Sequence, residues 1–190
     1  MELNVDIFEI LQSRCGLFDV DLFASKLNWQ VRKYVSYLPD RKAFAVDAFS
    51  ISWGQFIKAY AIPPFSILGQ VLQKVEEEGV KLTLIAPIWA TQPWFSKSLH
   101  LMAADSYILP NMCNLLQHPS DPNKLPSIQS MRLTVFRLSG IRSEILTYRK
   151  KLSTLCCHHG RSRPNASIGS ISRKGCYFVV ENKLIRLTHL

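Results

Sequence analysis

The chain has 190 residues, of which 47% are hydrophobic, and it carries 23 lysines and arginines against 14 aspartates and glutamates. This length and apolar fraction exclude a disordered chain and allow one domain of ordinary size with a buried core. The most apolar stretch, residues 82–90, contains Pro87 and is far too short to span a membrane, so no membrane partner is expected. The acidic N-terminal segment lacks the basic region of a signal peptide, which predicts an intracellular protein, cytoplasmic or nuclear.

The positive charge is concentrated towards one end of the sequence. Residues 1–140 carry 13 basic and 12 acidic side chains, whereas residues 141–190 carry 10 and 2. The sequence therefore predicts a nearly neutral body, residues 1–140, and a basic linker or tail, residues 141–190. The basic residues of this tail that could bind DNA or RNA weakly are Arg149, Lys150, Lys151, Arg161 and Arg163.

The five cysteines are scattered and contain no C-x-x-C pair, so free thiols are expected. Cys156, Cys157, His158 and His159 have the composition of a zinc site. Their contiguous spacing does not allow the chain to wrap around an ion, because such sites separate their ligands by two to five residues. No metal is expected.

The first half of the chain alternates helical and strand patterns. Asn4 is a candidate N-cap for a helix over residues 5–14. Alternating apolar residues predict a strand over 17–23, and a second strand is expected over 43–49. A short apolar run at 59–62 then ends at two prolines.

The pattern continues in the second half. The elements expected there are a helix over 66–78 with Ser66 as N-cap, a strand over 80–86, a helix over 93–103 and a strand over 131–137. Glu76, Glu77 and Glu78, at the end of the first of these helices, are interpreted as solvated. This alternation predicts an α/β fold, a three-layer arrangement around a largely parallel sheet.

The pattern stops near residue 140, where we place a domain boundary. Beyond it Ser, Arg, His, Gly and Asn dominate, which predicts an irregular tail with a helical turn around residues 144–152. Residues 176–180 and 184–187 are expected to form a small terminal hairpin.

Ligands of open α/β sheets bind beyond the carboxyl ends of the strands. Asp21 and Asp47 fall at or near predicted strand ends, where a carboxylate can bind a ribose hydroxyl or an amine, or simply close a turn. The segment Ile62-Pro63-Pro64-Phe65 predicts a rigid extended corner. In amino-methylating enzymes such a corner is headed by Asp or Asn, which binds the target amine, and ends in a ring that stacks on a flipped base. Isoleucine at position 62 cannot accept a hydrogen bond.

Several separated motifs resemble, in the same order, the pol polyproteins of DIRS-type retrotransposons over residues 1–140. The motifs are Asp19–Asn28, Tyr34-Val35-Ser36, Val46-Asp47-Ala48-Phe49 with Trp53, Pro63-Pro64-Phe65-Ser66, Ala86-Pro87-Ile88-Trp89, Gln92-Pro93-Trp94-Phe95 and Arg137-Leu138-Ser139-Gly140. In those polyproteins this region lies between ribonuclease H and a tyrosine recombinase, and it is similar to phage Dam-type DNA adenine N6-methyltransferases. The resemblance implies a Rossmann-like sheet of methyltransferase type.

The resemblance also implies residue roles. Asp21 matches the family's acid near S-adenosylmethionine, Ala24, Ser25 and Asn28 match its flanking motif, and Asp47 is grouped with them as a cofactor-binding candidate. Pro63, Pro64 and Phe65 match the catalytic corner, and Ile62 stands where the enzymes have Asn or Asp.

Three functions follow as hypotheses. The first is a non-catalytic methyltransferase-like fragment of a retrotransposon polyprotein, with no cofactor and with the other pol domains as partners. The second is an active DNA adenine N6-methyltransferase that uses S-adenosylmethionine. The third is a nucleic-acid-binding module that acts through the basic tail. Ile62 favours the first hypothesis over the second, since the amine would lose its orienting acceptor.

Overall fold

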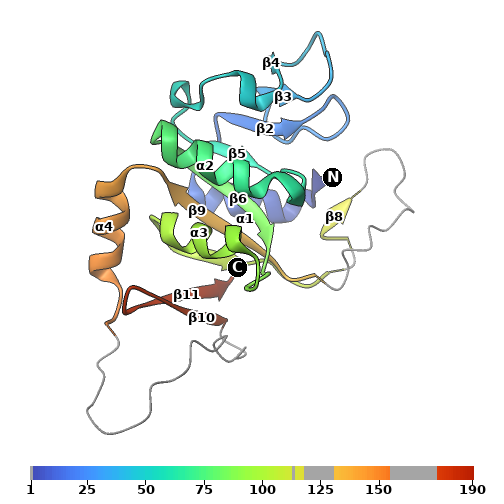
Figure 1. Ribbon diagram of the computed structural model, residues 1–190. Coiled ribbons are helices and arrows are strands. Elements are labelled where there is room, and N and C mark those ends of the chain that lie inside the picture. Colours follow the sequence, from blue (N-terminus) through green and yellow to red (C-terminus); the bar gives the residue numbers. More distant parts are fainter. Residues whose placement is uncertain (1, 113, 118–130, 155–174) are drawn as a thin grey trace, which may run out of the picture.

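The centre of the protein is a sheet of nine strands. The computed structural model describes residues 2–112, 114–117, 131–154 and 175–190. In spatial order the strands are β10 (Cys176–Val180), β11 (Lys183–His189), β7 (Ser106–Ile108), β9 (Leu133–Ser139), β6 (Lys81–Pro87), β5 (Ala59–Ala61), β2 (Val20–Ala24), β3 (Tyr34–Ser36) and β4 (Ala45–Val46) (Figure 1). Two further short strands, β1 (Glu2–Leu3) and β8 (Leu116–Gln117), pair with each other outside this sheet.

Most neighbouring strands of the sheet are parallel. Five adjacent strands, β4, β3, β2, β5 and β6, are parallel to one another. Strand β9 is antiparallel to both β6 and β7, β11 is parallel to β7, and β10 returns antiparallel beside β11. The predicted α/β class with a largely parallel sheet is confirmed.

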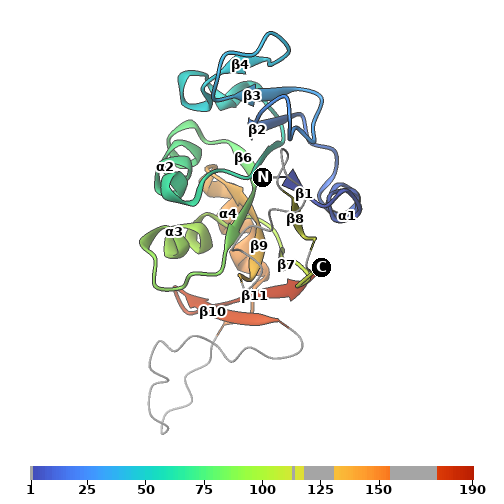
Figure 2. The ribbon, with the colours of Figure 1, turned by 90° about the vertical axis from the view of Figure 1, so that its right-hand side faces the viewer.

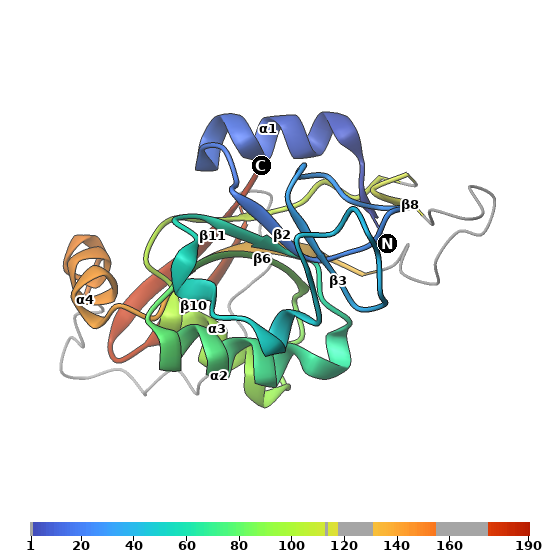
Figure 3. The same cartoon turned by 90° about the horizontal axis from the view of Figure 1, so that it is seen from above.

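Helices cover both faces of the sheet and give it three layers (Figures 2 and 3). Helix α1 (Val5–Cys15) covers one face, and α2 (Leu68–Glu78) and α3 (Pro93–Leu101) cover the other. Six consecutive residues of β6, Leu82 to Pro87, are buried, as expected for a strand between two helical layers. A fourth helix, α4 (Arg142–Lys151), follows β9. No helix in the described ranges has the length and apolar character needed to cross a membrane.

The helix ends follow the sequence signals only in part. Asn4 caps α1 as predicted, its Oδ1 accepting from the backbone N–H groups of Asp6 at 3.0 Å and Ile7 at 3.4 Å. Ser66, however, does not cap α2. A 3₁₀ turn over Phe65–Ile67 precedes α2, because the N–H of Ile67 donates to the carbonyl oxygen of Pro64 at 3.1 Å.

Two predicted strands are shorter than expected. β2 begins at Val20 rather than at residue 17, and only Ala45 and Val46 of the predicted strand 43–49 are extended. The chain turns at Asp47, whose φ is 61°, and continues as a 3₁₀ turn over Ala48–Ser50.

The connections between β2, β3 and β4 contain no helix, although parallel strands are usually joined by one. Residues 25–33 join β2 to β3 and residues 37–44 join β3 to β4, and both segments are described in full. Neither helical layer therefore extends over these three strands from these connections.

The sheet continues past the domain boundary that the sequence predicts near residue 140. The expected terminal hairpin is present as β10 and β11, and its buried residues Ile185 and Leu187 join the core formed by β6, β9, α2 and α3. Since β11 pairs with β7, the hairpin is part of the main sheet rather than of a separate tail. The predicted helical turn around 144–152 is the ten-residue helix α4. Arg161, Arg163 and the Cys156–His159 cluster lie outside the described residues.

Candidate functional site

The sequence predicts that Asp21, Asp47 and Pro63 meet at the carboxyl edge of the parallel strands. Pro63 follows the end of β5 and Asp47 follows the end of β4, but Asp21 is the second residue of β2 and lies inside the sheet. Strands β2 and β3 separate β5 from β4, so Pro63 and Asp47 are three strand spacings apart, about 14 Å. Asp21 therefore does not meet Pro63 and Asp47 at the carboxyl edge, which corrects that prediction.

Asp21 is buried, and its carboxylate accepts hydrogen bonds from within the fold. Only 4% of it is exposed, and its carboxylate accepts from the backbone N–H groups of Phe23 at 3.3 Å and Gln30 at 3.4 Å. Burial raises the pKa of Asp21 to about 7, although the two N–H groups act to lower it. Its burial and these two hydrogen bonds occupy the carboxylate within the fold.

The Ala24-Ser25 and Asn28 motif forms a closed turn at the end of β2. The Ser25 hydroxyl donates to Oδ1 of Asn28 at 2.5 Å, and the N–H of Asn28 donates to the carbonyl oxygen of Ser25 at 3.1 Å. Ala24 is buried. These contacts explain the residue types of the motif as a turn that ends the strand.

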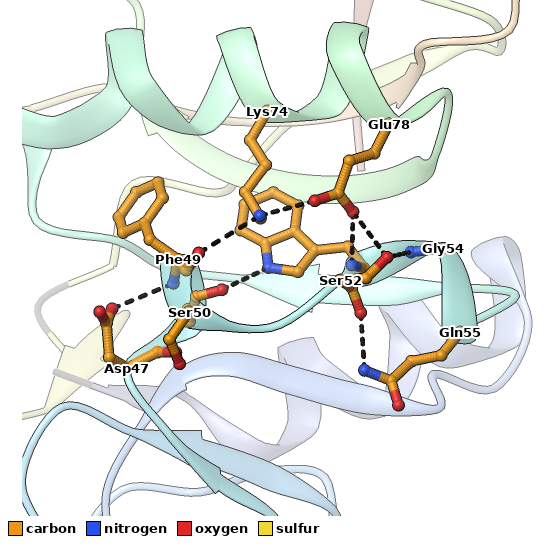
Figure 4. A network of polar contacts seen from close by, with 10 residues as sticks. Asp47, Phe49, Ser50, Ser52, Gly54, Gln55, Lys74 and Glu78 are labelled. Carbon is orange, nitrogen blue, oxygen red and sulfur yellow. Dashed lines mark hydrogen bonds and ion pairs between the residues drawn. The ribbon is translucent and has the colours of Figure 1, made fainter.

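Asp47 is a capping residue. Its Oδ1 accepts from the N–H of Phe49 at 3.0 Å, at the start of the 3₁₀ turn (Figure 4). The indole N–H of Trp53 donates to the carbonyl oxygen of Ala48 at 2.7 Å, which holds the same turn from inside the core. The structural interpretation of Asp47 as a turn-closing acid therefore accounts for its contacts.

A polar network joins this segment to α2 (Figure 4). Glu78 accepts from the N–H of Trp53 at 2.5 Å and pairs with Lys74 at 2.6 Å, and Lys74 also donates to the carbonyl oxygen of Phe49 at 3.4 Å. Partial burial acts to raise the pKa of Glu78, but the hydrogen bonds from Lys74 and Trp53 outweigh it and hold the pKa below its usual range. The prediction that this glutamate is merely solvated is wrong.

The two glutamates before it also have partners. Glu76 pairs with Lys97 of α3 at 2.9 Å, and Glu77 accepts from Gln73 at 2.7 Å. The acidic end of α2 therefore fixes neighbouring segments, which offsets its unfavourable position in the helix dipole.

The proline corner lies at the carboxyl end of β5. Pro63 is buried, Pro64 is exposed, and Ile62 packs against the core beneath α1. The ring of Phe65 meets Trp89 edge-on at 5.5 Å, and Trp89 contacts Trp94 at 6.2 Å. Three motifs that are separate in the sequence thus come together as an aromatic cluster beyond β5 and β6. The side chain at the head of the corner offers no hydrogen-bonding atom.

The basic residues of the predicted tail are not equivalent. Arg149 donates to a carboxylate oxygen of Glu181 in the β10–β11 turn and to the carbonyl oxygen of His100 at 2.9 Å. It therefore links α4 to the hairpin and to α3, whereas Lys150 and Lys151 are exposed.

A cavity of about 1100 Å³ opens beside β3, lined entirely by residues between Ser25 and Lys42; we call it the β3 cavity. Its wall includes the rings of Trp29 and Tyr34, which are nearly parallel, 8° apart, with centroids 6.2 Å from each other. The basic side chains that line it are Lys26, Arg32, Arg41 and Lys42.

Sequence reasoning missed the β3 cavity because it summed charge over whole domains. Residues 25–42 alone carry five basic side chains and one acidic side chain, a local excess that the neutral total of residues 1–140 conceals. Within the described ranges, no group of three or more His, Cys, Asp or Glu side chains could hold a metal ion.

No protein-family model matches the chain, and no curated protein is significantly similar to it in sequence.

Proposed function

We propose that this chain is a non-catalytic methyltransferase-like domain of a DIRS-type retrotransposon pol polyprotein, which handles nucleic acid for neighbouring reverse transcriptase, ribonuclease H and recombinase domains. The observation that carries the proposal is a sheet of methyltransferase-like strand order that has Ile62 at the head of its proline corner.

The strand order supports the methyltransferase part of the proposal. If β2, β3, β4, β5, β6, β7 and β9 are numbered one to seven, their spatial order reads three, two, one, four, five, seven, six. Of these seven strands only the last, β9, is antiparallel to its neighbours. The order three, two, one, four, five is that of doubly wound, Rossmann-like sheets, the class to which the methyltransferase resemblance points. Fold alone does not fix function, so the corner decides between an active and an inactive domain.

The residues after β2 do not fit S-adenosylmethionine. In nucleotide-binding α/β folds the loop after the first strand is glycine-rich and opens a helix whose N-terminus faces the ligand. Here that loop has no glycine, forms the Ser25–Asn28 turn, and reaches β3 without a helix. Asp21, the family's acid near the cofactor, is buried beneath Gln30. No methyl transfer is therefore assigned to this site.

The corner lacks the group that would orient a target amine. Losing one well-placed hydrogen bond to a group of developing charge removes about 1.5–3 kcal/mol, or roughly ten- to a hundredfold in rate. Ile62 also places apolar bulk where the amine would lie, so the loss at this corner exceeds that range.

The test compares the unmodified chain with Ile62→Asn and with Ile62→Val as a control. Each is incubated with labelled S-adenosylmethionine and with single- and double-stranded DNA, and cofactor binding is measured separately by calorimetry. We expect no methylation and no cofactor binding in all three. Methylation by the unmodified chain would overturn the proposal. Methylation by Ile62→Asn alone would contradict our account of the cofactor site.

The proposed origin has its own test. The genomic DNA on either side of this coding sequence is sequenced and translated in all frames. Reverse transcriptase codons upstream and recombinase codons downstream are the expected result. Their absence from both sides in several independent copies would contradict the polyprotein assignment.

A further inference from the structure

We infer that the β3 cavity binds single-stranded nucleic acid, with an unpaired base on Trp29 and backbone phosphates on Lys26, Arg32, Arg41 and Lys42. The inference goes beyond the proposed function and does not depend on it, because it rests on side chains that play no part in the proline corner or in the cofactor argument.

The cavity exists because of how β2, β3 and β4 are connected. The two connections, residues 25–33 and 37–44, have too few residues to place a helix over the strands and form irregular loops instead. A cavity of about 1100 Å³ is at the upper end of the range for ligand sites, and it has room for more than one nucleotide.

The aromatic wall of the cavity consists of one buried ring and one exposed ring. Tyr34 is buried, and its hydroxyl donates to a carboxylate oxygen of Asp40 at 2.6 Å, which fixes the phenol ring in the wall. Trp29 lies nearly parallel to that ring and is 48% exposed. An unpaired base that stacks on Trp29 would continue an arrangement that already exists, at a low cost in side-chain entropy.

The rim of the cavity is positively charged, and the charge is available. Among the described residues no ion pair involves Lys26, Arg32, Arg41 or Lys42. The one acid of the cavity, Asp40, already accepts from Tyr34 and from the backbone N–H of Lys42 at 3.0 Å. Its carboxylate is therefore part of the wall, and the cavity keeps an excess of positive charge that matches a phosphate backbone.

The combination favours a single strand over a duplex. Phosphate contacts alone would serve either, but the faces of paired bases are covered by their neighbours and cannot stack on a side chain. Leu27 and Leu38, which also line the cavity and are 54% and 67% exposed, add apolar surface suited to base faces.

The experiment measures binding of the full chain to fluorescently labelled oligothymidylate and oligouridylate of about a dozen residues, and to a duplex of the same length. The variants are Trp29→Ala, Trp29→Phe and the double variant Arg41→Glu/Lys42→Glu. The α4 control, Lys150→Glu/Lys151→Glu, changes the net charge by the same amount and tests the competing prediction that the basic tail binds nucleic acid. Circular dichroism confirms that each variant is folded.

We expect both single strands to bind more tightly than the duplex, and their relative affinities identify whether DNA or RNA is preferred. Trp29→Ala should weaken binding about tenfold or more, and Trp29→Phe should retain most of it. Arg41→Glu/Lys42→Glu should reduce the slope of log affinity against log salt by about 1.4, the value for two lost phosphate contacts on a single strand. The α4 control should bind like the unmodified chain.

Four results would overturn the inference, three from the variants and the duplex and one from competition. One is equal binding of duplex and single strand, and another is unchanged affinity in Trp29→Ala. The third is loss of binding in Lys150→Glu/Lys151→Glu but not in Arg41→Glu/Lys42→Glu, which would assign binding to α4. A base-free polyanion such as heparin serves as competitor, and equal competition per charge would likewise show that no base is recognised.

Discussion

Asp21 is a buried carboxyl group that no described ion pair involves, and replacing it by asparagine should make the protein more stable in a pH-dependent way. Its ordinary pKa of 3.8 rises to about 7 in the folded chain, because burial disfavours the charged form. The folded chain therefore holds a proton that the unfolded chain releases near pH 4. The stability that this bound proton gives the folded chain is fully present below about pH 4, and it is lost as the pH rises through about 7.

The size of the effect follows from these two pKa values. Between about pH 5 and pH 8 the ionisation of this one group lowers the free energy of unfolding by about 2.5 kcal/mol. An asparagine side chain at this position would stay neutral throughout that range. It would keep one acceptor oxygen for the two backbone N–H groups, and the hydrogen bond that it loses costs the same at both pH values. The gain of Asp21→Asn over the unmodified chain should therefore be about 2.5 kcal/mol larger at pH 8 than at pH 5.

The assay is urea unfolding at the two pH values, followed by the fluorescence of the four tryptophans, of which Trp53 is fully buried. Glu9→Gln, which removes an exposed charge on α1, controls for the change in net charge. If Asp21→Asn differs from the unmodified chain by the same free energy at both pH values, the carboxyl group is not the proton-binding group that its burial indicates.

Three other substitutions test how the fold is held together. Gly140→Ala would place a Cβ 1.9 Å from a backbone carbonyl oxygen of α2 and should cost about 3 kcal/mol in chemical unfolding. Gly69→Ala, in open space on α2, should instead stabilise the protein, by up to about 1 kcal/mol. Glu78→Ala removes both the partner of Lys74 and the acceptor for a backbone N–H, and a fall of about 2 kcal/mol in the free energy of unfolding is expected. Leu187→Ala should lower the free energy of unfolding by about 3 kcal/mol if β11 belongs to the core. Val179→Ala, on the exposed face of the hairpin, should change it little. Equally small effects of both substitutions would show that the hairpin packs loosely.

The long elements could be predicted because their pattern of burial is local. Leu68, Val71, Leu72 and Val75 follow helical spacing, and all four are fully buried in α2. Strands β3 and β7 could not be predicted in the same way, because each has only three residues and is defined by its partners in the sheet. The hairpin at 176–187 was visible as two apolar runs, but its pairing with β7, a segment about 80 residues earlier, leaves no local signal.

In the candidate site too, properties of a single side chain could be predicted and properties that depend on contacts could not. That Ile62 cannot accept a hydrogen bond is a property of the side chain itself, so the sequence is sufficient to predict it. That Asp21 is buried depends on its contact with the backbone of Gln30, nine residues later in the connection to β3, and alternation within the strand does not reveal that contact. The role of Glu78 depends on its contact with Trp53, 25 residues earlier in the chain, which periodicity does not reveal, whereas Asp47 acts through a local contact with Phe49.

The position of β9 has a consequence for the order in which the protein folds. In the main sheet β7 pairs only with β9 and β11, and both of these strands come later in the chain. Although β7 comes before them in the chain, it joins the sheet only through β9, which pairs with β6. The hairpin of β10 and β11 joins the rest of the sheet only through β7. The strands from β4 to β6 can assemble by contacts nearer in sequence, so the slow steps of folding should concern β9 and the strands beyond it.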